Sequence, residues 1–298
     1  MGGPLLAVLG GLGAAVCFTV SALCASSSSQ EIGAESTLAW VMLTGLVLVA
    51  PPTAALADPA QLSPTVLGLL AAGACNVAGL LVEYVAFRRG KVGVVTGIAS
   101  TEGMVAAVIS AVAGARLGLR TGLLLGLVTL GVAFSAASPD DGGRSSAEVP
   151  AEVAAPADGR RTARGAVLAL PVALLFGVTL YATGRAGQQV SVLWALVPAR
   201  LFGSALVTAP LAARRRLRLT RRALPLVVAA GAAEVLGVLS YTVGARHQLA
   251  VAAVFSSQFA ALTAVAAFLI HGQRLSRSQL AGLAAVVVGV TLLGAIGP

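Results

Sequence analysis

The chain has 298 residues, of which 57% are hydrophobic and only 10% are charged. Soluble domains carry about 25% charged residues, so this composition excludes an ordinary soluble domain and indicates a protein that crosses a membrane several times. The formal net charge is +9, but the basic residues fall almost entirely between apolar segments. We therefore interpret the charge as a feature of membrane topology, with no nucleic-acid partner.

Apolar segments of roughly 20 residues, the length that crosses about 30 Å of hydrocarbon as a helix, recur along the whole chain. We predict ten transmembrane helices, over residues 4–24, 36–56, 65–87, 92–114, 120–137, 165–184, 193–212, 223–244, 249–271 and 278–296. The first segment lacks a basic leading region and further spans follow it, so we interpret it as a retained helix and not as a signal peptide. The predicted class is an all-α polytopic membrane protein.

One segment interrupts this pattern. Residues 138–163 are polar and rich in Pro, Gly, Ser and acidic side chains. Such a composition cannot bury enough apolar surface to fold, and we predict a flexible linker. It would separate a first five-helix unit over residues 1–137 from a second five-helix unit over residues 164–298.

The two predicted units resemble each other at a nearly constant spacing. AVCF (15–18) aligns with ALLF (173–176), and AAGACNVAG (71–79) aligns with AAGAAEVLG (229–237), both at an offset of 158 residues. A duplication accounts for matches that share one offset. Because five is an odd number, the second unit must enter the membrane in the opposite direction. This arrangement, two inverted five-helix repeats, predicts a shared site near mid-depth.

Basic residues are distributed unevenly between the predicted loops. Fifteen Lys and Arg residues lie in loops after odd-numbered spans, and four lie in loops after even-numbered spans. Cytoplasmic loops carry the excess of Lys and Arg. We therefore predict that both termini lie outside, with the protein in a bacterial-type plasma membrane.

Several polar residues fall near the middle of predicted spans. An ionisable group at mid-bilayer costs about 2.5–3.5 kcal/mol on insertion scales, so it is usually paired, protonated or in contact with water. Glu102 and Glu234 are the two acids at this depth, and Arg200 is a candidate counter-ion for either. The other candidates for substrate binding or proton coupling carry amide or hydroxyl groups: Asn76, Gln258, Thr101, Ser257 and Tyr181.

Each candidate also has a purely structural interpretation. Ser and Thr hydroxyls in membrane helices often bond to carbonyl groups of the preceding turn, amides can bridge helices, and acids can form structural pairs with Arg200. Glu83 lies near the end of a predicted span, close to Arg88 and Arg89. For Glu83 we predict an interfacial position.

Catalytic and metal-binding motifs are missing from the sequence. Cys17, Cys24 and Cys75 lie inside apolar segments without a CxxC pattern, which argues against disulfides and metal. There is no HExxH, no P-loop and no G-x-S-x-G with a partnered histidine. We expect no metal, no cofactor and no enzymatic reaction.

Motifs near the end of each unit resemble a known family. Arg116-Leu117 and Arg274-Leu275 are each followed, fifteen residues after the Arg, by Gly-Val. Ten spans in two inverted fives with these endings resemble the EamA-type transporters of the drug/metabolite transporter superfamily. The stretch GQRLSRSQLAGLAAVVVGV (272–290) is similar to the family's Gly-Glu-Arg-Leu-Thr ending, although Ala115 and Gln273 stand where the family usually has glutamate. The resemblance implies exporters or exchangers of small metabolites, amino acids or drugs, with a central cavity.

The sequence is compatible with three functions. The first is a secondary active transporter, an exporter that works by alternating access and exchanges protons at Glu102 or Glu234. The second is an uncoupled facilitator or importer whose acids bind a cationic metabolite. The third, a membrane-embedded enzyme or an interaction protein, is disfavoured by the missing catalytic motifs and by the inverted repeat.

Overall fold

The structure is a computed structural model that describes residues 2–58, 60, 65–89, 92–114, 122–123, 126, 158–259, 262 and 266. The described residues form helices joined by turns, without any strand. The predicted spans 120–137 and 278–296, and the end of 249–271 beyond residue 259, lie outside them, apart from isolated residues. The same holds for most of the predicted linker, although a helix already begins at Asp158, inside it.

The first half of the chain contributes five described helices: α1 (Gly2–Ile32), α2 (Ala34–Leu56), α3 (Val66–Arg89), α4 (Val92–Ala99) and α5 (Glu102–Val112). The second half contributes α7 (Asp158–Gly187), α8 (Val192–Gly203), the π-helix η2 (Ser204–Thr208), α9 (Ala209–Ala213) and α10 (Ala223–Ser256). A non-helical residue inside α10, Gln248 (φ −148°, ψ 100°), separates the predicted spans 223–244 and 249–271. Within the described part, seven helical stretches are long and apolar enough to cross a membrane, which confirms the multi-pass class.

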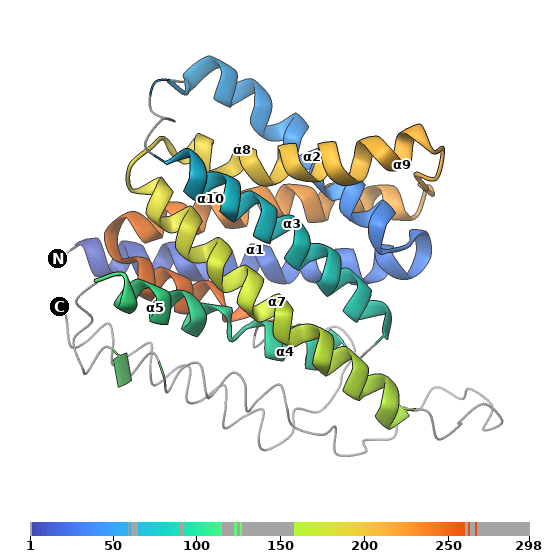
Figure 1. The fold of residues 1–298 in the computed structure, drawn as a ribbon, viewed down its shortest axis with the longest axis horizontal. Helices are drawn as coiled ribbons and strands as arrows, with labels where there is room; N and C mark the ends of the chain where they lie inside the picture. The colour runs from blue at the N-terminus through green and yellow to red at the C-terminus, as the bar shows by residue number, and fades with distance from the viewer. Residues whose placement is uncertain are drawn as a thin grey trace.

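Two helix pairs form the centre of the bundle. α1 packs along α10, and α3 packs along α7, and these are the two most extensive pairings among the described helices (Figure 1). At the offset of 158 residues, α7 corresponds to α1 and the first part of α10 corresponds to α3. The two pairings are therefore equivalent contacts. In each of them, the first helix of one half packs along the third helix of the other half.

Close contacts at glycines show the same reciprocity at single residues. A Cβ added to Gly79 would lie 2.5 Å from the ring of Phe176, and one added to Gly237 would lie 2.5 Å from the ring of Phe18. Gly79 and Gly237 are equivalent positions, as are Phe18 and Phe176. Such mutual contacts are what a two-fold relation between two halves requires.

The outside of the bundle is apolar. Leu67 is 82% exposed, Leu56 77% and Leu206 65%. Large aliphatic side chains at such exposure match a surface whose solvent is lipid, where every backbone group is already satisfied within a helix. The lipid bilayer is thus the medium in which these described helices are stable.

Loops that carry basic residues gather at one end of the bundle. Gln30 donates a hydrogen bond to the carbonyl of Phe87 (2.9 Å), and the Trp40 indole donates to the carbonyl of Arg218 (2.9 Å). These contacts bring the loops after α1, α3 and α9 together. The described basic residues of these loops, among them Arg88, Arg89 and Arg218, therefore lie at one end of the bundle, while the predicted orientation itself stays a prediction.

The predicted helix over 92–114 is wrong in one respect, because the structure breaks it at Ser100–Thr101. The Ser100 hydroxyl donates to the carbonyl of Gly97 (2.7 Å) and the Thr101 hydroxyl to that of Ile98 (2.8 Å). Hydroxyl groups that bond to carbonyls of the preceding turn compete with the helical ladder. A turn at Ser257–Gln258 ends α10 in the same way, and these residues correspond to Ser100–Thr101 at an offset of 157.

The Gly79 contact gives a stability prediction. Gly79→Ala is expected to lower the free energy of unfolding by about 1–3 kcal/mol, because its methyl group overpacks against the Phe176 ring. Gly68→Ala in the same helix is the matched control, since a Cβ there meets nothing within 4 Å. Thermal unfolding in detergent measures both, and Phe176→Leu should recover part of the loss. Equal stability of the two glycine variants would contradict the packing argument.

Candidate functional site

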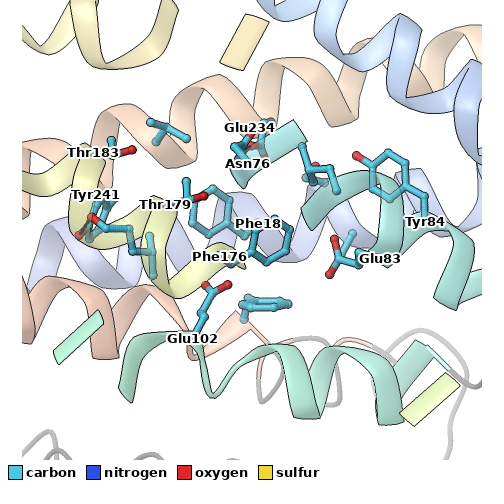
Figure 2. Close-up of a pocket in the computed structure, with 16 residues that line it drawn as sticks. Phe18, Asn76, Glu83, Tyr84, Glu102, Phe176, Thr179, Thr183, Glu234 and Tyr241 are labelled. Atoms are coloured by element: carbon cyan, nitrogen blue, oxygen red, sulfur yellow. Dashed lines mark hydrogen bonds between the residues drawn. The ribbon is translucent and has the colours of Figure 1, made fainter. Parts of the chain in front are cut away.

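A cavity of about 60 Å³ lies among α1, α3, α5, α7 and α10 (Figure 2). At roughly 10–15 Å³ for each water, it has room for several water molecules. Most of its lining is apolar or aromatic, but it also contains three glutamates. It is the larger of two neighbouring cavities that share Asn76, Thr179, Thr183 and Val238.

The cavity lining repeats the symmetry of the fold. Most lining residues occur as equivalent pairs, one from each half, at the offset of 158 residues: Phe18 and Phe176, Ser21 and Thr179, Ala22 and Leu180, Asn76 and Glu234, Leu80 and Val238, and Glu83 and Tyr241. A cavity lined by such pairs lies on the axis that relates the halves. This is the location at which a repeat-based transporter holds its site.

The three glutamates come from three different helices. Glu83 is on α3, Glu102 is the first residue of α5, and Glu234 is on α10. Their exposed fractions are 4%, 3% and 5%. Figure 2 shows the three carboxylates on different sides of the Phe18 and Phe176 rings, so that they surround one space.

Glu234 is the acid that Arg200 neutralises. The Arg200 Nη1 lies 3.8 Å from Glu234 Oε1, and the Asn76 amide donates a hydrogen bond to the same oxygen at 3.4 Å. Arg200 was a candidate counter-ion for either mid-span acid, and the structure pairs it with Glu234. Asn76 and Glu234, equivalent positions in the two halves, therefore meet across the axis.

Arg200 itself is almost completely enclosed, with an exposed fraction of 1%. Its Nε and Nη2 atoms have no hydrogen-bond partner among the described residues. A small cavity of about 10 Å³ beside it, lined in part by Asn76 and Thr179, has room for about one water molecule. Gly45 of α2 leaves the space for the guanidinium stem, since a Cβ there would lie 2.8 Å from Nε.

Glu83 and Glu102 have no such partner. No described basic side chain forms an ion pair with either of them. Glu102 interacts electrostatically with Glu83 and Glu234, and Glu83 with Glu234, so the charged neighbours of both are acids. The described part of the cavity thus holds two carboxyl groups without a compensating cation.

The backbone around Glu102 is fixed by close packing on both sides. A Cβ on Gly103 would lie 2.5 Å from the Ser257 hydroxyl, and one on Gly177 of α7 would lie 3.0 Å from the Glu102 carbonyl oxygen. The equivalent of Gly177 is Thr19, whose hydroxyl donates to the carbonyl of Phe259 (3.0 Å), the residue after the turn at Ser257–Gln258. The break at Ser100–Thr101 lets α5 start here, with Glu102 aimed into the cavity (Figure 2).

The other predicted candidates stand outside the cavity lining. Thr101 donates to the carbonyl of Ile98, while Ser257 and the Gln258 amide both donate to the carbonyl of Val254, each at 2.8 Å. These contacts match the structural interpretation, in which polar side chains bond to their own helix. Tyr181 is half-buried and packs beside the cavity wall.

The prediction that Glu83 is interfacial is wrong. Its side chain is buried and lines the cavity, because Asn76 and Glu83 are seven residues apart on α3 and so lie on the same face two turns apart. The seven-residue spacing of Asn76 and Glu83 in the sequence was the feature that could have indicated a shared face. The aromatic lining was also missed as a site, although Phe18 and Phe176 end the aligned AVCF and ALLF segments.

Comparison with known proteins identifies the family. The EamA-like transporter family matches residues 5–137 and 163–295. The chain belongs to the EamA-like transporter family. Family membership makes it a multi-pass membrane transporter of the drug/metabolite type. Both matched segments contribute to the cavity, the first through α1, α3 and α5 and the second through α7 and α10.

A solved structure described as "Crystal structure of protein" shares the fold of this EamA-like transporter. Its TM-score is 0.71 at 16% sequence identity, and the alignment covers 97% of this chain and 96% of that chain. At this identity the likeness concerns the fold alone. No curated protein matches the chain.

Proposed function

We propose that this protein is a secondary active transporter that exports a small metabolite, amino acid or drug by alternating access, and that protons exchange at its cavity acids. The observation that carries the proposal is the group of three buried glutamates around one cavity between the two halves. Buried ionisable groups in membrane proteins mark ion and substrate pathways. Two-fold related halves supply the means of opening such a site to either side in turn.

The size of the cavity supports a moving site. Ligand pockets commonly measure about 300–1,000 Å³, whereas this cavity measures about 60 Å³. Cargo of ordinary size would therefore enter only if the helices around the cavity separate. The reciprocal contacts of Gly79 with Phe176 and of Gly237 with Phe18 join helices that would take part in such a separation.

Coupling to protons follows from the charges around Glu102. The titratable groups that face it are Glu83 and Tyr84 on α3 and Glu234 and Tyr241 on α10, with Arg200 held by Glu234. Carboxylates that share a poorly hydrated site are not all ionised together unless cations neutralise them. In the empty cavity a proton would occupy Glu102 or Glu83. Cargo binding would release that proton, so that the two move in opposite directions.

A comparison of small molecules in the medium and cytosol of cells tests the proposal. Cells would overproduce either the wild type or Glu102→Gln, at matched amounts of protein in the membrane. We expect at least one compound to be enriched in the medium with the wild type only. Depletion from the medium would indicate uptake instead, and no difference between the two cultures would overturn the role of Glu102 in export.

A further inference from the structure

We propose that the cargo is an organic cation, an ammonium group on an apolar aromatic or alkyl body; this rests on the proposed transport function. The charges around the cavity are not balanced. Arg200 is committed to Glu234 at 3.8 Å, while Glu83 and Glu102 have no cationic partner among the described residues. A cation would neutralise one or both, whereas an anion would meet three acids.

The repeat does not require these charges. Each charged residue stands where the other half has a neutral one: at the offset of 158 residues Glu83 corresponds to Tyr241, Glu234 to Asn76 and Arg200 to Met42, and at 157 Glu102 corresponds to Phe259. The packing is the same in both halves, because Arg200 lies against Gly45 and Met42 lies against the equivalent Gly203. Neutral side chains therefore pack at the equivalent places. Since charge burial in a membrane is costly, packing alone gives no reason for the acids, whereas a ligand does.

Aromatic side chains form much of the cavity wall. Five rings line the cavity, those of Phe18, Tyr84, Phe176, Tyr241 and Phe259. Figure 2 shows the Phe18 and Phe176 rings in the space between the carboxylates. The face of an aromatic ring attracts a cation, most strongly where water is excluded. The Tyr241 hydroxyl is already committed to the carbonyl of Leu180 (2.6 Å), which leaves its ring as the surface offered to cargo.

A cation and a proton would then compete for the same carboxyl groups. A compact ammonium group between Glu83 and Glu102 would take the place of a proton on either acid, and its apolar body would contact the rings. A neutral compound of the same shape gains the ring contacts but displaces no proton. The competition thus links the cargo class to the direction of proton movement.

Three compounds of matched shape test the cargo class: phenethylammonium, 2-phenylethanol and phenylacetate, which are cationic, neutral and anionic. Their binding to the purified full-length protein in detergent would be measured by equilibrium dialysis, with choline and tetraphenylphosphonium as further cations. We expect phenethylammonium to bind at least about 30-fold more tightly than its neutral and anionic counterparts, the factor that matches loss of a buried charge contact of about 2 kcal/mol. The charge series needs no variant, so a folding defect cannot obscure it.

Variants then locate the site. Glu83→Gln and Glu102→Gln should each weaken phenethylammonium binding, and Phe176→Leu should weaken it by about 3–30-fold. Glu35→Gln is the matched control, because Glu35 is exposed near the start of α2 and should bind as the wild type does. Loss of binding as the pH falls would accompany competition by protons.

Two results would overturn the inference: tighter binding of the neutral or anionic compound, or no binding of any of the three cations. Normal cation binding by both glutamine variants would also reject this site. Failure of the cargo class is distinguishable from failure of the proposed function. A chain that exports an anionic or neutral compound refutes only the cargo class, whereas a chain that binds cations but moves nothing refutes transport.

Discussion

Glu102→Gln is expected to abolish cargo movement driven by a pH gradient while the protein remains inserted in the membrane. Glutamine keeps the size and the hydrogen-bonding groups of the side chain but cannot take up or release a proton. The rate of gradient-driven transport should fall by about 100-fold or more, the loss typical when a positioned proton-transfer group is removed. Insertion should be unaffected, because no described side chain forms an ion pair with Glu102.

Proteoliposomes separate coupling from translocation. With an acidic interior, outward movement of protons should drive accumulation of labelled cargo by the wild type and not by Glu102→Gln. At equal pH and saturating cargo, the variant should still exchange labelled for unlabelled molecules. Glu35→Gln serves as the control on protein amount and orientation. Accumulation by Glu102→Gln at the wild-type rate would remove this residue from the coupling mechanism.

Most of the described helices could be predicted from the sequence, because the hydrocarbon core of a membrane accepts few kinds of segment. A helix that crosses it needs an uninterrupted apolar stretch, and stretches such as 36–56 and 65–87 show this directly. The structure places α2 at Ala34–Leu56 and α3 at Val66–Arg89, within two residues of the predictions at each end. Depth along a helix axis follows from such boundaries.

The boundaries of a helix do not show which of its faces is turned toward the centre of the bundle. Glu83 is six residues from the end of α3 at Arg89, about 9 Å along the axis, and that depth alone is compatible with an interfacial acid. What buries it is the face it shares with Asn76, which is turned toward the cavity by the packing of α3 on α7. The break at Ser100–Thr101 was likewise hidden, because polar side chains in a span fit either a continuous or a broken helix.

The candidate site was predictable to the extent that the repeat was. The offset of 158 residues pairs Asn76 with Glu234, and the structure brings these two side chains to 3.4 Å. The same offset also relates Phe18 to Phe176 and Glu83 to Tyr241, which are further residues of the cavity lining. Thr101 and Gln258 correspond at an offset of 157 residues, but their polar groups bond to their own helices.

The largest effect on stability is expected at Arg200. Arg200→Met leaves the Glu234 carboxylate buried without its cation, and removing one partner of a buried ion pair costs about 3–5 kcal/mol of unfolding free energy. Arg185→Met is the control, because Arg185 is exposed at the end of α7 and its replacement should change stability by less than about 0.5 kcal/mol. Unfolding of the purified protein in mixed micelles measures both variants.

The double variant Arg200→Met with Glu234→Asn shows what the ion pair is for. It gives the second half the residues that the first half carries at the equivalent positions, Met42 and Asn76, which already pack within the same fold. We therefore expect most of the lost stability to return, with a coupling energy in the double-mutant cycle well above the error of additivity, about 0.3–0.5 kcal/mol. A double variant as unstable as Arg200→Met would show that the two halves need different side chains here. Recovered stability together with lost transport would assign the buried charge pair to function, since neutral residues then suffice for the fold.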